Sequence, residues 1–340
     1  MTTKHNLDML LNELPAFWFP QRTWTLREGV GGMNNTTRFV EVDGATYVLR
    51  LYETHRDRNK IAFEHRVLLE LGRQQHALDF AIPQPLKRPN GETMVTLPGG
   101  KLAALFTYTE GENPGAFALS QLPYIGKAVG QLSAALSRIE LDVKPEYAPY
   151  YEIEQIHPRC TPDAIRAFCE QPPGPFAKQK GELAYIFARY MAIYEAIPFI
   201  RSLPHQLVHG DINGSNMLID EEGQLAAILD FEFVTRDVRV MELAVCLSDL
   251  IDPSRSESEL RHQCDAFCAG YRQHIQLSHA EMRVLPLLIE LRRLDVFIHF
   301  LGRYLDQVDS QAVLIDIIQS THEKTKWLQL HGARLLFAHQ

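Results

Sequence analysis

The chain has 340 residues, more than a single hydrophobic core usually organises, so its length predicts two lobes. Hydrophobic residues make up 46% of the chain and charged residues 22%, values that are ordinary for a soluble globular protein. The formal charge of −8, and the lack of a basic run interleaved with aromatic residues, argue against nucleic acid or an anionic membrane as a partner.

The cysteines and the apolar segments indicate where the protein works. Five scattered cysteines, without a CxxC pair, predict free and mostly buried thiols in a reducing compartment and argue against zinc. The N-terminal segment does not resemble a secretory signal, and no uninterrupted apolar run approaches the ~20 residues of a membrane span. We therefore expect a cytoplasmic protein that does not bind membranes. No pattern indicates its oligomeric state.

The first hundred residues predict a helix followed by a small antiparallel sheet. A helical pattern stops at Pro15. Three strand-like segments follow, at 23–30, 35–42 and 45–53. The second and third are joined by Asp43-Gly44, a strong signal for a two-residue hairpin. A helix with a broad apolar stripe is predicted over 56–75, and a further hairpin over 92–108.

A polar connector containing Gly and Pro then marks the boundary between the lobes. We place an N-terminal lobe at 1–107, a hinge at 108–115 and a C-terminal lobe at 116–340. Helices are expected at 118–139, at 176–197 and from about 238 onward, with an irregular segment at 142–175. The expected fold class is α+β, with a small antiparallel β-sheet in the first lobe and a mainly helical second lobe.

A polar run, HGDINGSN, interrupts the apolar sequence between residues 207 and 220. It contains Asp211 and, five residues later, Asn216, and Asp230 follows in the apolar stretch ILDFE. We expect the flanking strands to hold their loop ends side by side, so that these three side chains converge. Gly210 and Gly214 would permit the tight backbone that this needs.

Two carboxylates and an amide oxygen suit Mg²⁺ bound to phosphates. Phosphoryl transfer needs such a metal, and a carboxylate that orients the attacking hydroxyl. The spacing of Asp211, Asn216 and Asp230 matches the catalytic loop and metal-binding motif of protein kinases. The structural alternative is a simple turn with Asp230 as a strand-end cap, but two motifs at the right separation after a β-rich lobe favour catalysis. His209 is expected to hold the loop by a hydrogen bond.

With these residues the sequence resembles the aminoglycoside phosphotransferase / choline kinase superfamily of small-molecule kinases. Its first lobe, GVGGMNNTTRFVEVDGATYVLRLYE, is most similar to the type II homoserine kinase branch, and the resemblance spans roughly residues 25 to 305. The resemblance implies a protein-kinase-like two-lobe fold that uses ATP and Mg²⁺. It implies that Asp211 orients the acceptor hydroxyl and that Asn216 and Asp230 bind the metal.

The resemblance also implies roles in the first lobe. Gly29, Gly31 and Gly32 would form a loop over the ATP phosphates, although a plain hairpin turn explains them as well. Arg50 stands where most kinases place a phosphate-contacting lysine, and Glu64 matches the glutamate that pairs with that cation. The structural alternatives are an exposed strand arginine and a solvated helix face.

The hinge and the segment after Asp230 bear on the two substrates. The resemblance implies that LFTYTEGE receives adenine on its backbone, with Tyr108 and Glu110 nearby. The chain is expected to become helical within about eight residues of Asp230, and Glu232, which replaces the glycine usual in protein kinases, is a candidate for binding the acceptor. This leaves no room for a peptide-binding segment and favours a small hydroxylated acceptor.

A basic stripe on a C-terminal helix, Arg292, His299 and Arg303, is a candidate site for a carboxylate such as that of homoserine, although a solvated helix face is an alternative. Asp237 and Glu242 are candidates for binding a substrate amine, but Glu242 is explained more simply by pairing within its helix.

The predicted function is therefore ATP-dependent phosphorylation of a small metabolite such as homoserine or a related amino alcohol. Three alternatives stay open. An aminoglycoside or other antibiotic phosphotransferase would need a strongly acidic acceptor pocket. A sugar or choline-type kinase would differ only in its acceptor. A pseudokinase would bind nucleotide without turnover, and it predicts loss of the metal ligands, which this sequence retains.

Overall fold

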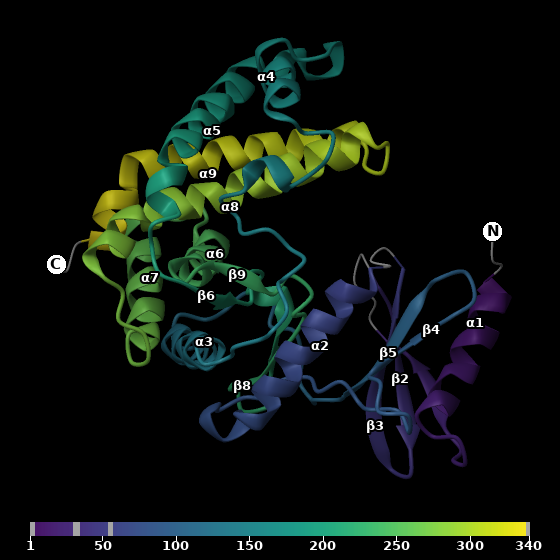
Figure 1. Ribbon diagram of the computed structural model, residues 1–340. Coiled ribbons are helices and arrows are strands. Elements are labelled where there is room, and N and C mark those ends of the chain that lie inside the picture. The colour runs from purple at the N-terminus through teal and green to yellow at the C-terminus, as the bar shows by residue number, and fades with distance from the viewer. Residues whose placement is uncertain (1–3, 30–34, 54–56, 338–340) are drawn as a thin grey trace. The chain divides into compact units, whose positions relative to one another are not determined.

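The structure is a computed structural model that describes residues 4–29, 35–53 and 57–337. It divides into two compact units, each made of several chain segments (Figure 1). The first unit comprises 1–113, 139–146 and 217–232. The second comprises 114–138, 147–216 and 233–340.

The first unit is built on a five-stranded antiparallel sheet in the order β1-β2-β3-β5-β4. Its strands are β1 (Thr25–Glu28), β2 (Asn35–Val42), β3 (Ala45–Tyr52), β4 (Met94–Thr96) and β5 (Leu102–Thr107). The β2–β3 hairpin turns at Asp43 and Gly44 with φ of 52° and 81°, as two-residue hairpins of this kind require. The predicted strands and hairpins are confirmed.

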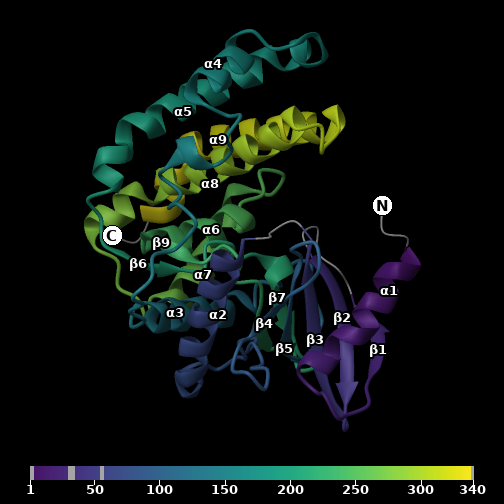
Figure 2. The same ribbon diagram turned by 45° about the vertical axis from the view of Figure 1, so that its right-hand side comes forward.

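The two faces of this sheet carry different helices, α1 (Lys4–Glu13) and α2 (Arg58–Arg73), which lie on opposite sides of it (Figures 1 and 2). Successive residues of a strand point to opposite faces. Leu49 and Leu51 of β3 therefore join the apolar core that includes Leu11 of α1. Arg50, between them, faces α2 and reaches Glu64. The pleat of β3 thus aims one arginine away from the core.

The β7 (Met217–Ile219) and β8 (Leu225–Ile228) hairpin belongs to the first unit. Glu112 and Ile219 exchange two backbone hydrogen bonds of 2.9 Å, and Ala81 donates to Ala226 at 2.8 Å. The sequence placed every residue after 115 in the second lobe. The structure differs because these backbone bonds tie the hairpin to the segments around Ala81 and Glu112, while the first boundary, at 113/114, falls within the expected hinge.

The second unit is mainly helical. Its helices are α3 (Leu122–Leu136), α4 (Pro162–Glu170), α5 (Lys180–Ile200), α6 (Val240–Leu250), α7 (Glu257–Tyr271), α8 (His279–Leu305) and α9 (Gln311–Phe337). Short 3₁₀ turns add η3 (Ile153–Gln155), η4 (Gly174–Gln179) and η5 (Gly214–Asn216), while η1 (Leu14–Phe17) and η2 (Gln75–Ala77) lie in the first unit. The segment predicted to be irregular contains α4, which begins at the N-cap Thr161 with Pro162 in the first position.

The strands around the polar loop do not pair as expected. β6 (His205–Val208) pairs with β9 (Thr235–Val238), and β7 pairs with β8, so the two strands that flank the loop each pair with a different strand. The sequence TRDV did not suggest a strand because two of its four residues are charged. α6 begins at Val240, ten positions after Asp230, so the intervening segment is about as short as predicted.

One described segment, Gly174–Ile200, is long and apolar enough to cross a membrane by length and composition, although no such run was expected. Its helix α5 packs against α4, α8 and α9 of the same unit. A single helix of this kind is also typical of a soluble protein's core, so it is weak evidence for a membrane span.

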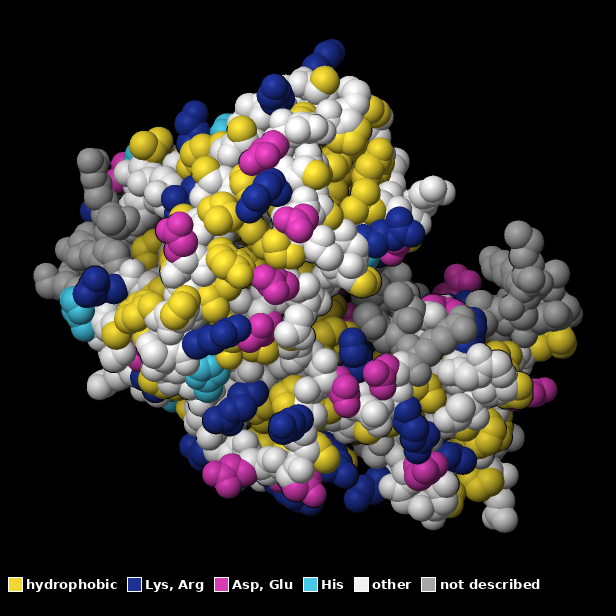
Figure 3. All heavy atoms as spheres, turned by 45° about the horizontal axis from the view of Figure 1, so that its top comes forward, with side chains coloured by type: hydrophobic (Ala, Val, Ile, Leu, Met, Phe, Trp, Pro, Cys, Tyr) yellow, Lys and Arg dark blue, Asp and Glu magenta, His cyan; other side chains and the backbone are white. Residues whose placement is uncertain are grey.

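On the face in Figure 3, the described basic side chains lie among acidic and hydrophobic ones.

Helices α3 and α7 approach closely because each carries a glycine that faces the backbone of the other helix. A Cβ added at Gly126 would lie 1.9 Å from the Phe267 carbonyl oxygen, and one at Gly270 would lie 1.9 Å from that of Pro123. α3 in turn supports β6, because the Gln206 side chain donates to the backbone and hydroxyl oxygens of Ser133. The position of β6, which leads into the polar loop, therefore depends on this contact.

We predict that Gly126→Ala lowers the free energy of unfolding by about 1–3 kcal/mol or more, because the backbone of α7 has to move. Gly181→Ala is the control, since a Cβ there meets nothing within 4 Å and alanine favours the helix by up to about 1 kcal/mol. Urea unfolding of both variants measures the difference. Equal stabilities would contradict the close packing of α3 and α7.

Candidate active site

One group of candidate residues lies in the first unit, where Arg50 bridges two carboxylates. Its Nη1 lies 3.3 Å from Glu64 Oε1 and 3.5 Å from Asp230 Oδ1. The Tyr52 hydroxyl donates to the other oxygen of Glu64, at 3.5 Å. β3 supplies Arg50, α2 supplies Glu64, and Asp230 follows β8. The structure therefore brings together three residues that the sequence assigned to nucleotide and metal.

Burial and charge determine the electrostatics of this group. Burial alone would lower the pKa of Arg50, but the negative charges of Asp230 and Glu64 outweigh it and hold that pKa above its ordinary value. Burial raises the pKa of Glu64 to about 8, although Arg50 opposes the shift. Glu64 is only 3% exposed, so its role is to hold Arg50 and not to meet a ligand directly.

The backbone at Asp230 is unusual. Its φ is +61°, in the left-handed region that few residues other than glycine adopt. Aspartate tolerates this conformation better than most side chains, and such outliers gather at functional sites. Two residues on, Glu232 is buried and accepts a hydrogen bond from Asn35 at 3.5 Å. Glu232 thus binds a neighbour within its own unit.

The remaining candidates of the first unit are more dispersed. Gly29 follows β1, and a Cβ there would lie 3.0 Å from the carbonyl oxygen of Thr37, so the two strands approach closely at this point. Gly31 and Gly32 lie outside the described residues. Tyr108 and Glu110 are both exposed after β5, and the Tyr108 ring packs edge-on against Phe39.

The second group lies in the second unit, where the polar loop is held by its own backbone. Gly210 has a φ of +82°, and a Cβ there would approach the Phe233 carbonyl oxygen to 3.2 Å. The buried carboxylate of Glu242 accepts the N–H groups of His209 at 2.6 Å and Gly210 at 3.4 Å. His209 Nδ1 accepts the N–H of Asp211 at 3.2 Å, which confirms its expected role. The sequence had offered Glu242 for a substrate amine, but it binds backbone.

Both carboxylate oxygens of Asp211 are engaged. Asn216 Nδ2 donates to Oδ2 at 3.2 Å and to the Asp211 carbonyl oxygen at 2.9 Å. Arg292 Nη2 donates to Oδ1 at 2.6 Å. Arg292 also contacts Asp295 at 2.9 Å and lies over the ring of Tyr150, 5.6 Å from its centroid. The sequence placed Arg292 near the acceptor but did not connect it with Asp211, because 81 residues separate the two.

Tyr150 and Asp237 support the loop from beneath. The Tyr150 hydroxyl donates to the Gly210 carbonyl oxygen at 2.5 Å, and its N–H donates to Asp237 at 2.6 Å. Burial raises the pKa of Asp237 to about 7, although the N–H groups of Tyr150 and Val238 oppose the shift. Asp237 is fully buried, so the structure gives it to the backbone and not to a substrate.

The three residues of the predicted basic stripe on α8, Arg292, His299 and Arg303, have different surroundings. Arg303 makes two bonds to Asp309, Nε to Oδ2 at 2.5 Å and Nη2 to Oδ1 at 2.9 Å. His299 is exposed, and its ring packs edge-on against Phe300. Arg303 follows Arg292 by eleven residues, which is about 16 Å along a helix. Only Arg292 of the three reaches Asp211.

Arg293 was missed by the sequence reasoning. Burial and the neighbouring charge of Arg292 lower its pKa to about 10. Its Nε is buried and has no hydrogen-bond partner among the residues described in the structure. The signal that could have found it is the doublet Arg292-Arg293 inside an otherwise apolar helix.

Residues 25–277 match the model of the phosphotransferase enzyme family. The chain belongs to this family. A homoserine kinase from Polaromonas naphthalenivorans (strain CJ2) is 28% identical over 290 residues, which cover 83% of this chain and 82% of that one.

Two solved structures resemble this phosphotransferase. The microcompartment-associated aminopropanol kinase is 17% identical with a TM-score of 0.73, covering 96% of this chain and 98% of that one. The amicoumacin kinase hAmiN, in complex with AMP-PNP, Ca²⁺ and Ami, is 17% identical with a TM-score of 0.67, covering 94% and 93%. The kinase-like α+β fold and the superfamily resemblance predicted from sequence are confirmed.

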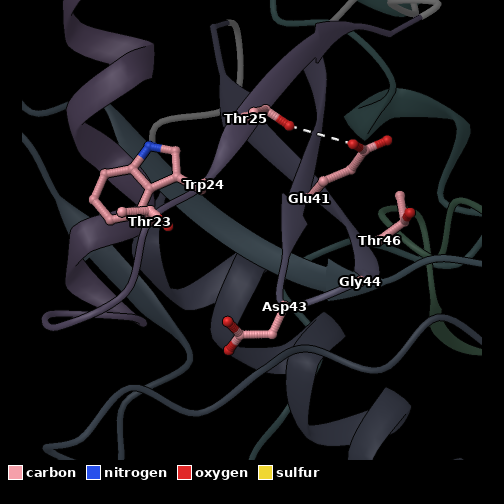
Figure 4. Close-up of a pocket in the computed structure, with 7 residues that line it drawn as sticks. All are labelled: Thr23, Trp24, Thr25, Glu41, Asp43, Gly44 and Thr46. Atoms are coloured by element: carbon pink, nitrogen blue, oxygen red, sulfur yellow. Dashed lines mark hydrogen bonds between the residues drawn. The ribbon is translucent and has the colours of Figure 1, made fainter.

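A cavity of about 490 Å³ in this phosphotransferase is lined by none of the candidate residues and lies in the first unit (Figure 4). It is lined by residues of and near β1, β2 and β3, among them Trp24, Glu41 and Asp43. Arg27 and Arg22 already pair with these two carboxylates. Among the described residues, no three His, Cys, Asp or Glu side chains gather as a metal site.

We predict that Glu242→Gln flattens the pH dependence of stability. Burial raises the pKa of Glu242 to about 7 from the ordinary 4.5, so the folded state binds the proton more tightly than the unfolded state. The wild type therefore loses stability as the pH rises from about 4.5 to 7, by at most about 3 kcal/mol through this group. Unfolding free energies at pH 5 and pH 8 measure the slope.

The exposed variant Glu222→Gln serves as the control and is expected to keep the wild-type slope. If Glu242→Gln also keeps it, Glu242 is ionised in the folded state over the whole range, and the assigned burial effect is wrong.

Proposed function

We propose that this phosphotransferase transfers the γ-phosphoryl group of ATP to a hydroxyl of a small metabolite. The observation that carries the proposal is the Asp211 carboxylate, held 3.2 Å from the Asn216 amide by a loop whose backbone is bound by Glu242. Phosphoryl transfer needs a carboxylate in a fixed position to orient the attacking hydroxyl, and an oxygen ligand beside it to bind a metal. Pseudokinase function is disfavoured because Asp211, Asn216 and Asp230 are all present.

The first unit is proposed to bind the nucleotide. Arg50, steadied by Glu64, offers N–H groups to the phosphates, and the backbone at Gly29, Gly31 and Gly32 is proposed to cover them. The segment with Tyr108 and Glu110 is proposed to receive adenine on its backbone groups. Arginine in place of lysine suits two-pronged binding of phosphate oxygens.

Mg²⁺ is the metal proposed for Asp230 and Asn216, by the chemistry of their side chains. Asp230 and Asn216 offer a carboxylate and an amide oxygen, the hard ligands that Mg²⁺ takes. The Asn216 amide presents its N–H to Asp211, which leaves its oxygen for the metal. When bound, Mg²⁺ would neutralise charge on the phosphate oxygens.

Asp211 is proposed to accept a hydrogen bond from the acceptor hydroxyl and then its proton. The hydroxyl oxygen bonds to the γ-phosphorus, the bond from that phosphorus to the bridging oxygen breaks, and ADP leaves. The products are ADP and a phosphate monoester.

The acceptor is proposed to be homoserine or a related amino alcohol. The relatives and neighbours named above include a homoserine kinase and an aminopropanol kinase. An aminoglycoside or other antibiotic is the second candidate, since one neighbour is an amicoumacin kinase, and a sugar or choline remains a third. Arg292 beside Asp211 disfavours a polycationic acceptor because like charges repel. ATP consumption measured against these acceptors decides among them.

A cytoplasmic location is part of the proposal. All five cysteines are free and buried. Burial raises the pKa of Cys160 and Cys264, so these thiols are unreactive. A protein that keeps five unpaired thiols suits a reducing compartment.

We predict that Asp211→Asn lowers kcat at least 100-fold, because asparagine accepts no proton from the hydroxyl. The Kd for ATP with Mg²⁺, measured by calorimetry, is expected to change little. Asp142→Asn, on an exposed residue of the first unit, is the control. Activity that persists in Asp211→Asn would remove Asp211 from its role.

We predict that Arg50→Met raises the KM for ATP at least tenfold, whereas Arg50→Lys recovers part of the loss because it keeps the charge. Arg27→Met is the control, since Arg27 pairs with Glu41 on the surface. Circular dichroism checks folding, because Glu64 loses its partner. An unchanged KM in a folded Arg50→Met enzyme would refute the nucleotide role.

A further inference from the structure

Arg292 and Arg293 are consecutive residues of α8, and Arg292 reaches the polar loop of the second unit. Arg292 bonds to Asp211 directly. Arg293 lies within electrostatic range of Tyr150 and of Asp249, whose carboxylate accepts the N–H of Gly214 in the same loop. Arg292 therefore contacts the loop that carries the proposed base, and Arg293 is its immediate neighbour in α8.

The two arginines differ in how their charges are balanced. Arg292 has two carboxylates at bonding distance, Asp211 and Asp295. Arg293 forms no ion pair within the residues that the structure describes, and its buried Nε is without a hydrogen-bond partner among them. A partly buried cation without a partner is costly, and a nearby like charge adds to the cost. The buried Arg293 Nε is thus a hydrogen-bond donor that an added acceptor atom would satisfy.

The Arg292–Asp211 pair has a second consequence. At 2.6 Å it is a charge-assisted hydrogen bond that occupies Oδ1, while Asn216 occupies Oδ2. A carboxylate bound in this way is a poorer acceptor for a hydroxyl proton. A productive complex therefore requires Arg292 to take another anionic partner.

We propose that Arg292 and Arg293 bind a carboxylate of the acceptor, and that this carboxylate draws Arg292 away from Asp211. Guanidinium groups match a carboxylate through two parallel N–H···O bonds. The carboxylate oxygens accept hydrogen bonds from Arg293, and Asp211 Oδ1 becomes available to the acceptor hydroxyl. The inference rests on the proposed function and narrows its acceptor to small hydroxy acids and hydroxy amino acids.

An anion at this position has two possible sources, the acceptor carboxylate and a phosphate of the nucleotide. The proposal commits to the carboxylate. L-Homoserine and 3-aminopropan-1-ol form a matched pair, since they differ only by the carboxylate, and L-homoserinamide keeps the size of homoserine without the charge. ATP with Mg²⁺ probes the phosphate.

The wild-type enzyme is expected to prefer L-homoserine over both neutral analogues at least tenfold in kcat/KM, as a charge-assisted contact implies. Arg293→Met is expected to reduce this preference to threefold or less, chiefly through a higher KM for homoserine, and Arg293→Lys to restore part of it. The Kd for ATP with Mg²⁺ stays unchanged in both. Arg283→Met, on an exposed residue of the same helix, keeps the wild-type preference.

The variant Arg292→Lys tests whether Arg292 exchanges Asp211 for the acceptor carboxylate or only attracts that carboxylate by its charge. Lysine keeps the positive charge but lacks the two parallel N–H donors of guanidinium. The variant is therefore expected to lower kcat for homoserine more than tenfold, while kcat for 3-aminopropan-1-ol changes less. Thermal unfolding checks every variant, and Arg293→Met is expected to be at least as stable as the wild type, because it removes a buried unpaired cation.

The inference is overturned if the wild type uses the amino alcohol as well as homoserine, or if Arg293→Met weakens nucleotide binding and leaves the preference intact. In the first case ATP-dependent phosphorylation still stands. If no acceptor is phosphorylated, the proposed function fails, and the carboxylate site is judged by the thermal shift that L-homoserine gives the wild type but not Arg293→Met. Absence of that shift in the wild type overturns it.

Discussion

The position of the polar loop in the second unit depends on one buried carboxylate, that of Glu242. Glu242 accepts the N–H groups of His209 and Gly210, and so it fixes the point where β6 ends and the polar loop begins. Gly210 can turn there because its φ is positive and because the Phe233 carbonyl oxygen leaves no room for a Cβ. Without this anchor, the direction of Asp211 would be left to a flexible loop. Preorganisation of this kind is what positions a carboxylate for proton transfer.

The structure uses buried carboxylates for support at some cost. Burial raises the pKa of Glu64 to about 8 and those of Asp237 and Glu242 to about 7. A shift of this size means that each charge is less stable inside the protein than in water. Glu64 accepts a hydrogen bond from Arg50, whereas Asp237 and Glu242 accept backbone N–H groups next to and within the polar loop. Proteins commonly give up stability at functional sites in this way.

In each unit, a charged candidate residue is paired with residues of the opposite charge. In the first, the Arg50 cation is balanced by the carboxylates of Glu64 and Asp230. In the second, the Asp211 carboxylate is balanced by Arg292. Arg293 differs, since it forms no ion pair within the described residues and its buried Nε has no hydrogen-bond partner among them.

The sequence by itself determined the local elements and indicated the chemistry that we propose for the site. Alternation and the Asp43-Gly44 turn specified β2 and β3, because strand period and hairpin turns are encoded over a few residues. The spacing of Asp211, Asn216 and Asp230 indicated phosphoryl transfer, and β3 with α2 supplied the pair Arg50–Glu64. The tertiary structure alone decided the pairing of β6 with β9 and the contact of Arg292 with Asp211. These join residues far apart in the chain, and side-chain pattern along one segment does not specify which distant segment packs against it.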